Sequence, residues 1–175
     1  MSRRLRRGRV AAAAAVVVAV TLVLGGIALS RSSAFHAETL RVEGASFRTD
    51  AEVLARAGLD RATNVIYLDR SAATAALRED PWIADAWIET DLPSTIVVHV
   101  RERSPIAAAD GQGVSADGVW LPGADVEGLP LLRAFDGSLD PASAAAAAAA
   151  LVDLPGSWRR QVETALLFPD ATIRF

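Results

Sequence analysis

Residues 81–105 read PWIADAWIETDLPSTIVVHVRERSP and contain the hairpin that decides the fold. Apolar and polar residues alternate in the second half of this stretch, as they do in a strand that buries one face. The inward positions are Ile96, Val98 and Val100. We expect strands at residues 82–89 and 95–103, because the five residues between them are a suitable length for an antiparallel connection.

The second strand ends in the charged triplet Arg101-Glu102-Arg103, which is followed by Ser104-Pro105. Because proline has no amide hydrogen to donate to a ladder, Pro105 is expected to stop the strand. We interpret the triplet as the polar exit of the strand, with Arg101 and Arg103 returning to solvent. This interpretation is simpler than a catalytic or anion-binding cluster.

Four shorter elements are expected before the hairpin. They are a strand at residues 38–43, a helix that ends at Ala57, an extended segment at residues 64–68 and a helix at residues 70–79. Thr49 and Glu52 form a capping-box pattern before the first helix, and Asp69 is a suitable N-cap for the second. The order strand, helix, helix, strand, strand predicts an α+β layer in which two helices cover one face of a three-stranded sheet.

Residues 104–175 indicate a second, β-rich unit. Short strands are expected at residues 106–109, 114–115 and 119–121, and a helix begins at Asp140-Pro141 and ends before Pro155. Further candidates are a helix at residues 158–164 and a hairpin of residues 166–168 and 172–175 around Pro169-Asp170. The first of these helices contains seven consecutive alanines, residues 144–150, which reflect either composition with high helix propensity or a docking face.

The N-terminal segment is basic and then apolar. The first 31 residues hold six arginines and no acidic residue, whereas the remainder holds 12 arginines and 21 acidic residues. Residues 10–29 are uncharged, and twenty helical residues rise about 30 Å, the thickness of the hydrocarbon core. We therefore predict a transmembrane helix with the N-terminus in the cytoplasm and the body outside, and a cleaved signal peptide is the alternative. The juxtamembrane basic residues are Arg3, Arg4, Arg6, Arg7 and Arg9.

No pattern for catalysis, metal binding or nucleic-acid binding is visible in the sequence. There is no cysteine, neither His36 nor His99 has a metal-ligand spacing, and the acidic body lacks a basic stripe. His99 falls on the polar face of its strand and is expected to be solvated. Trp82 and Trp87 should point to opposite faces of one strand, so that one is core and the other a candidate aromatic anchor for a partner. We expect no enzyme, cofactor or small-molecule substrate.

Six motifs follow the basic N-terminus in order. They are VEGA (residues 42–45), a helix ending at Gly58, NVIYLD (64–69), PWIADAWI (81–88), LPSTIVVHV (92–100) and RERSP (101–105). This series resembles the POTRA domain of the FtsQ/DivIB bacterial cell-division proteins. The resemblance implies a cytoplasmic tail at residues 1–9, a single transmembrane helix at 10–29, a POTRA domain at 35–103 with the order β-α-α-β-β, and a small, abbreviated FtsQ-type β domain at 104–175. Family members continue with further strands where this sequence stops.

The resemblance implies a non-enzymatic divisome scaffold at the septum. It would bind the lipid bilayer and FtsB/DivIC-like and FtsL-like single-pass division proteins, chiefly through the last strands of the β domain. The residues that correspond to this edge are Leu166, Leu167, Phe168, Thr172, Ile173, Arg174 and Phe175, with Trp87 as a further candidate. One alternative is a POTRA-like chaperone or translocation module for exported proteins, for which repeated POTRA units would be expected. An exported enzyme of unrecognised type is the third hypothesis.

Overall fold

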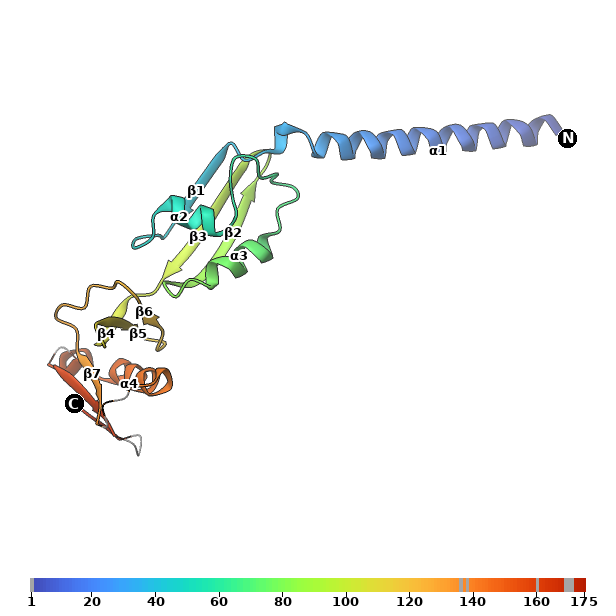
Figure 1. Ribbon diagram of the computed structural model, residues 1–175. Helices are drawn as coiled ribbons and strands as arrows, with labels where there is room; N and C mark the ends of the chain where they lie inside the picture. The colour runs from blue at the N-terminus through green and yellow to red at the C-terminus, as the bar shows by residue number, and fades with distance from the viewer. Residues whose placement is uncertain (1, 136, 138, 160, 169–171) are drawn as a thin grey trace.

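The computed structural model describes residues 2–135, 137, 139–159, 161–168 and 172–175, with side chains from residue 14 onward. A long helix, α1 (Ser2–Ser30), projects from a body made of two successive sheets, and the C-terminus lies at the opposite end (Figure 1). A short 3-10 helix, η1 (Ser33–Phe35), connects α1 to the body. In the part of the chain whose side chains are described, no helix is both long and apolar enough to cross a membrane.

The first sheet has three strands in the order β1-β3-β2. These strands are β1 (Thr39–Glu43), β2 (Ile83–Asp91) and β3 (Thr95–Glu102). β2 and β3 form the predicted antiparallel hairpin, with Ile88 opposite Val98, and β1 runs parallel to β3. Two helices, α2 (Asp50–Arg56) and α3 (Arg70–Arg78), cover one face, so the predicted α+β class is confirmed (Figure 1). The core between helices and sheet includes Val53, Leu77, Ile83, Ile96 and Val98.

Both helices of this layer begin at the predicted caps. The Glu52 amide donates to the Thr49 hydroxyl at 3.3 Å, and the Glu52 carboxylate accepts from the Thr49 amide at 2.8 Å. The Asp69 carboxylate accepts from the Ala72 amide at 3.0 Å. Gly58 follows α2 with a φ of +68°, a backbone conformation that glycine adopts without steric cost.

The glycine of the VEGA motif permits a close contact between strands. Gly44 directly follows β1 with a φ of +86°. A Cβ atom at this position would overlap the carbonyl oxygen of Val100 in β3. The chain can therefore leave β1 against β3 only if residue 44 has no side chain.

The segment at residues 64–68 is a turn, and the prediction of an extended segment there is wrong. The Asn64 side-chain oxygen accepts hydrogen bonds from the amides of Ile66 at 3.0 Å and Tyr67 at 3.3 Å. Such a local bond from an asparagine folds the backbone back on itself. The described residues keep a single backbone bridge, between Asn64 and His36, in the segment that was expected to be extended.

The second sheet has six strands in the order β6-β5-β4-β7-β8-β9. Its strands are β4 (Pro105–Ala109), β5 (Gln112–Ser115), β6 (Trp120–Leu121), β7 (Leu131–Ala134), β8 (Thr164–Leu167) and β9 (Ile173–Arg174). β7 lies in the middle, parallel to both β4 and β8, and was not predicted. The other five strands match the expected short strands and the C-terminal hairpin, whose predicted turn at Pro169-Asp170 lies outside the described residues.

The alanine-rich helix packs against this second sheet. α4 (Pro141–Asp153) starts as predicted, with Asp140 accepting hydrogen bonds from the amides of Ala142 and Ser143. Its buried side chains are Ala144, Ala147, Ala148 and Leu151. The alanine run is thus a core-facing helix, and its buried positions are not a docking face. α5 (Gly156–Arg159) begins two residues earlier than the predicted helix at 158–164. The predicted end is wrong because Thr164 already belongs to β8.

Candidate interaction surfaces and the joint between the sheets

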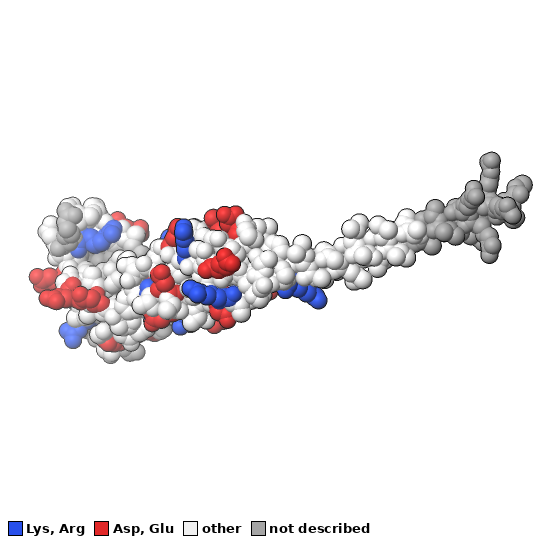
Figure 2. All heavy atoms as spheres, turned by 90° about the horizontal axis from the view of Figure 1, so that it is seen from above, with Lys and Arg blue, Asp and Glu red and all other residues white. Residues whose placement is uncertain are grey.

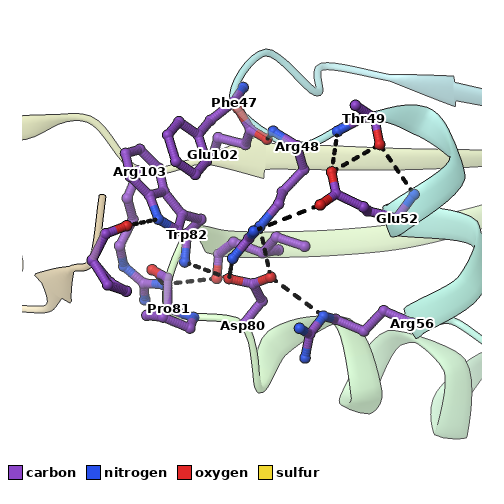
Figure 3. A network of polar contacts seen from close by, with 12 residues as sticks. Phe47, Arg48, Thr49, Glu52, Arg56, Asp80, Pro81, Trp82, Glu102 and Arg103 are labelled. Atoms are coloured by element: carbon purple, nitrogen blue, oxygen red, sulfur yellow. Dashed lines mark hydrogen bonds and ion pairs between the residues drawn. The ribbon is translucent and has the colours of Figure 1, made fainter. Parts of the chain in front are cut away.

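Asp80 is a buried carboxylate, 1% exposed, at the end of α3. Its Oδ1 accepts hydrogen bonds from the Trp82 amide at 3.0 Å and from Arg48 Nη2 at 3.1 Å. Its Oδ2 lies 3.0 Å from Arg48 Nε and 3.3 Å from Arg56 Nε. Figure 3 shows these groups converging from the loop before α2, the end of α2 and the turn before β2, so one carboxylate connects three segments.

The groups around Asp80 stabilise the ionised form of its carboxylate. Burial alone would raise the pKa of Asp80, but the Trp82 amide and the guanidinium groups of Arg48 and Arg56 outweigh this effect and lower the pKa. A cavity of about 350 Å³ lies beside the cluster and is lined in part by both arginines. Since these guanidinium groups already pair with Asp80, we assign the cluster a structural role.

Glu102, in the charged triplet, binds the loop between β1 and α2. Its carboxylate accepts hydrogen bonds from three successive backbone amides, those of Ser46 at 2.8 Å, Phe47 at 2.7 Å and Arg48 at 2.9 Å. Three amides that converge on one carboxylate form a strong, charge-assisted arrangement. The triplet is therefore more than the polar end of a strand.

Arg103 points inward, and the prediction that it returns to solvent is wrong. Its side chain is only 17% exposed. Its Nη1 donates to the carbonyl oxygens of Pro81 at 2.9 Å and Ile83 at 2.7 Å, and its Nε donates to Asp117 Oδ2 at 2.8 Å. Arg101, in contrast, is exposed as expected. Because Asp117 lies in the turn between β5 and β6, Arg103 connects the first sheet to the second.

A second contact joins the two sheets nearby. The Trp82 indole Nε1 donates to the Pro122 carbonyl at 3.0 Å, and the Trp82 ring stacks on Phe47 with centroids 3.5 Å apart (Figure 3). We call these contacts, together with the Arg103–Asp117 pair, the joint. Pro105 lies just after it as the first residue of β4, so this proline opens the second sheet in addition to ending the first.

The electrostatics of the joint favour an ionised Asp117. Burial alone would raise its pKa, but hydrogen bonds from the Ser115 hydroxyl at 2.6 Å and from Arg103 lower it. The joint therefore combines an ion pair with a stacked aromatic contact in which Trp82 is buried and Phe47 is partly exposed.

The open face of the first sheet carries Trp87 and His99. Trp87 is 46% exposed, whereas Trp82 is buried, so the two tryptophans point to opposite faces as predicted. The Trp87 ring stacks on His99 with centroids 4.8 Å apart. His99 Nδ1 lies 3.3 Å from Glu43 and Nε2 lies 3.5 Å from Glu89. His99 is therefore largely covered by its neighbours, and the prediction of a solvated histidine is wrong.

The predicted C-terminal edge forms around β8 and β9. Leu166 pairs with Arg174 and Leu167 with Ile173. Phe168 stacks on Phe135 at 4.9 Å, and the Arg174 guanidinium lies 5.0 Å from the centre of the Phe168 ring. The structure thus brings together the seven predicted edge residues, which are Leu166, Leu167, Phe168, Thr172, Ile173, Arg174 and Phe175. Trp87 lies apart from them, on the first sheet.

The remaining predicted groups form no cluster in the described residues. Arg3, Arg4, Arg6, Arg7 and Arg9 belong to α1, and their side chains lie outside the described part of the chain. Among the side chains that the structure describes, no three histidine, aspartate or glutamate groups gather in a way that could hold a metal ion.

The first sheet and its helices match a known family. Residues 35–103 match the family model described as the POTRA domain, FtsQ-type, and this range contains α2, α3, the three strands and Asp80. Residues 35–103 are an FtsQ-type POTRA domain. The resemblance to the FtsQ/DivIB family predicted from the sequence is confirmed.

Curated relatives support the same family. The chain is 32% identical over 118 residues to the cell division protein FtsQ of Anaeromyxobacter sp. (strain K), which covers 64% of this chain and 40% of that protein. It is 31% identical over 124 residues to FtsQ of Rhizobium meliloti (strain 1021), covering 66% of this chain and 37% of that protein. It is 32% identical over 102 residues to FtsQ of Corynebacterium glutamicum, covering 57% of this chain and 46% of that protein. The chain therefore spans less than half the length of each of these relatives.

Sequence reasoning missed the polar residues that hold the POTRA domain together. Arg48 stands just before the Thr49 cap of α2, and Arg56 is the last residue of that helix. Asp80 stands directly before Pro81, where α3 must end. This combination of two arginines and a following acid was the available signal for a buried ion cluster.

Proposed function

We propose that this chain is a membrane-anchored, non-enzymatic scaffold of the bacterial division septum. The observation that carries the proposal is the FtsQ-type POTRA domain at residues 35–103, which follows an uncharged helical segment almost directly. Several relatives bear the name cell division protein FtsQ, which supports a division role. A scaffold needs surfaces rather than reactive groups, and the exposed Trp87 and the β9 edge are such surfaces.

The anchor in this proposal is residues 10–29 of α1. This segment has no charged residue, and nine large apolar side chains from Val16 to Leu29 are exposed rather than packed on the body. In Figure 2 the described part of this helix is an uncharged shaft, whereas acidic and arginine side chains are interspersed over the body. The arginine-rich tail at residues 1–9 would stay in the cytoplasm. The POTRA domain and an FtsQ-type β domain at 104–175 would lie outside, giving a single-pass type II protein.

The partner edge in this proposal is β9. Successive residues of an antiparallel strand direct their backbone groups alternately toward and away from the neighbouring strand. The Phe168 amide donates to the Thr172 carbonyl at 2.9 Å, so the backbone groups of Ile173 point away from β8. An extended segment of a partner could pair there and lengthen the sheet. The proposed partners are FtsB/DivIC-like and FtsL-like single-pass division proteins.

The division role is tested by the position of the protein in growing cells. A fluorescent protein fused to the N-terminus, expressed at native level, should concentrate at midcell in dividing cells. A uniform signal around the envelope would contradict the proposal. A matched fusion of residues 1–34, which lacks the POTRA domain, shows whether midcell enrichment requires more than the anchor.

The edge is tested by recovery of partners from detergent-solubilised membranes. Replacing Ile173 with proline removes one outward-pointing amide without removing a bond to β8, and replacing it with valine is the matched control. We expect Ile173→Pro to lose the small single-pass division proteins and Ile173→Val to retain them. Equal recovery by both variants would contradict the β9 assignment. Recovery of unfolded envelope proteins instead would favour the chaperone alternative.

A further inference from the structure

The end of α1 is fixed directly to the POTRA domain. The Ser30 hydroxyl and the Tyr67 hydroxyl lie 2.6 Å apart, and the Asn64 side-chain amide donates to the Ser30 carbonyl at 2.9 Å. The same Asn64 side chain holds the turn at residues 64–67 through the amides of Ile66 and Tyr67. The last residue of the helix is therefore bonded to a surface turn of the domain.

A second turn of the POTRA domain lies at the same end. The Ser94 carbonyl accepts hydrogen bonds from the amides of Glu38 at 2.9 Å and Thr39 at 3.1 Å, so the β2–β3 turn is bonded to the segment that follows α1. On the other side of this segment, the Ala37 amide donates to the Thr63 carbonyl at 2.9 Å. Both turns therefore flank the base of α1, at the end of the domain where the helix enters (Figure 1).

Large apolar side chains are exposed on these two turns. Ile66 is 42% exposed, Tyr67 54% and Leu92 61%. The Arg31 guanidinium lies 6.0 Å from the centre of the Tyr67 ring. A tyrosine with its hydroxyl bonded, apolar neighbours and an arginine at the end of an apolar helix is the composition typical of a membrane–water interface.

We propose that this end of the POTRA domain rests on the lipid surface, with Ile66, Tyr67 and Leu92 at the level of the headgroups. The inference rests on the proposed anchor in residues 10–29. The apolar run ends at Leu29, and Tyr67 is bonded to Ser30, so the Tyr67 ring must lie at the depth of the helix end. The domain is thereby held against the bilayer by its own surface as well as by the helix.

The contact is apolar in character. Acidic residues stand beside the two turns, including Glu38 and Asp91, and they oppose attraction to anionic headgroups. Insertion of Ile66 and Leu92 therefore does not depend on anionic lipid. Vesicles of pure phosphatidylcholine are a sufficient partner, and added anionic lipid should not deepen the contact.

The test uses the absence of cysteine from the chain, which allows single labels to be placed without removing any native thiol. Ile66→Cys and Leu92→Cys variants of the full chain are labelled with a nitroxide and reconstituted in phosphatidylcholine vesicles. Tyr67 is left in place because its hydroxyl is bonded to Ser30. Val152→Cys, an exposed apolar position on α4, is the matched control.

The measurement is the ratio of spin relaxation by oxygen, which enters lipid, to relaxation by a water-soluble nickel complex. We expect a ratio several-fold higher at residues 66 and 92 than at residue 152. Equal ratios at the three positions would overturn the proposal. A label at Leu22→Cys separates the proposed anchor from the proposed surface contact. A lipid-like ratio at residue 22 together with water-like ratios at residues 66 and 92 refutes only the surface contact. A water-like ratio at residue 22 refutes the anchor and, with it, this inference.

Discussion

Replacing Asp80 with asparagine should destabilise the POTRA domain by about 2–3 kcal/mol. Asparagine keeps the size of the side chain and an oxygen that can accept from the Trp82 amide, so the change removes mainly the negative charge. Hydrogen bonds to charged groups contribute about 1.5–3 kcal/mol each. Arg48 and Arg56 are partly exposed and can be hydrated when unpaired. The loss is therefore smaller than the roughly 3–5 kcal/mol expected when a fully buried pair is broken.

The assay is urea unfolding of the full chain in detergent, followed by tryptophan fluorescence. Asp85→Asn is the matched control, since Asp85 also pairs with an arginine, Arg78 at 2.7 Å, but on the surface. Exposed pairs contribute about 0–1 kcal/mol, so the control should change the free energy of unfolding little. The slope of the unfolding curve should be the same in both variants, because neither changes the buried surface.

The pH dependence gives a second readout of the same reasoning. The pKa of Asp80 is lowered in the folded state, so the unfolded chain takes up this proton first as the pH falls. The stabilisation by Asp80 is complete above its unfolded pKa of about 3.9 and is lost as the pH falls further toward the folded pKa. The gap between wild type and Asp80→Asn should shrink below about pH 4. A gap under about 0.5 kcal/mol at pH 7, or one that widens in acid, would refute the role assigned to Asp80.

Three further predictions concern packing and the joint. Ala148→Leu should cost about 1–3 kcal/mol because it overfills the face of α4 against the second sheet, whereas Ala149→Leu on the exposed face should stay within about 0.5 kcal/mol, as thermal unfolding would show. Glu102→Ala should cost about 2 kcal/mol in urea unfolding by leaving three amides without their acceptor. Trp82→Ala should cost about 3–5 kcal/mol by circular dichroism and expose the joint to protease, whereas Trp87→Ala should cost only about 1 kcal/mol.

Much of the POTRA domain could be predicted because its signals are local. The alternation in residues 95–100 places three apolar side chains on one face whatever packs there. The Thr49–Glu52 pattern and the Asp69 cap specify helix starts within four residues of chain. These features require no knowledge of distant segments, and the structure agrees with them.

The errors occurred where a distant segment decides the conformation or the surroundings. The position of Arg103 at the polar end of a strand predicts a solvent-exposed side chain. In the structure, Asp117 of the second sheet and the carbonyls of Pro81 and Ile83 surround its guanidinium. β7 is only four residues long and becomes a central strand because β4 and β8 lie on either side of it. His99 is polar and was placed correctly on its face, yet Trp87 covers it from the next strand.

If residues 10–29 are the anchor proposed above, the joint also sets how far the second sheet lies from the membrane. α1 is bonded to one end of the POTRA domain and the second sheet is bonded to the other, with the nine residues of β2 between them. Nine strand residues extend about 30 Å, so the second sheet begins about that far along the POTRA domain from the base of α1. A partner anchored in the same bilayer would need roughly 20 residues of helix to reach it. Deleting two turns from this helix of the partner should abolish its pairing with β9. Lengthening the POTRA sheet should require a matching extension of the partner's helix.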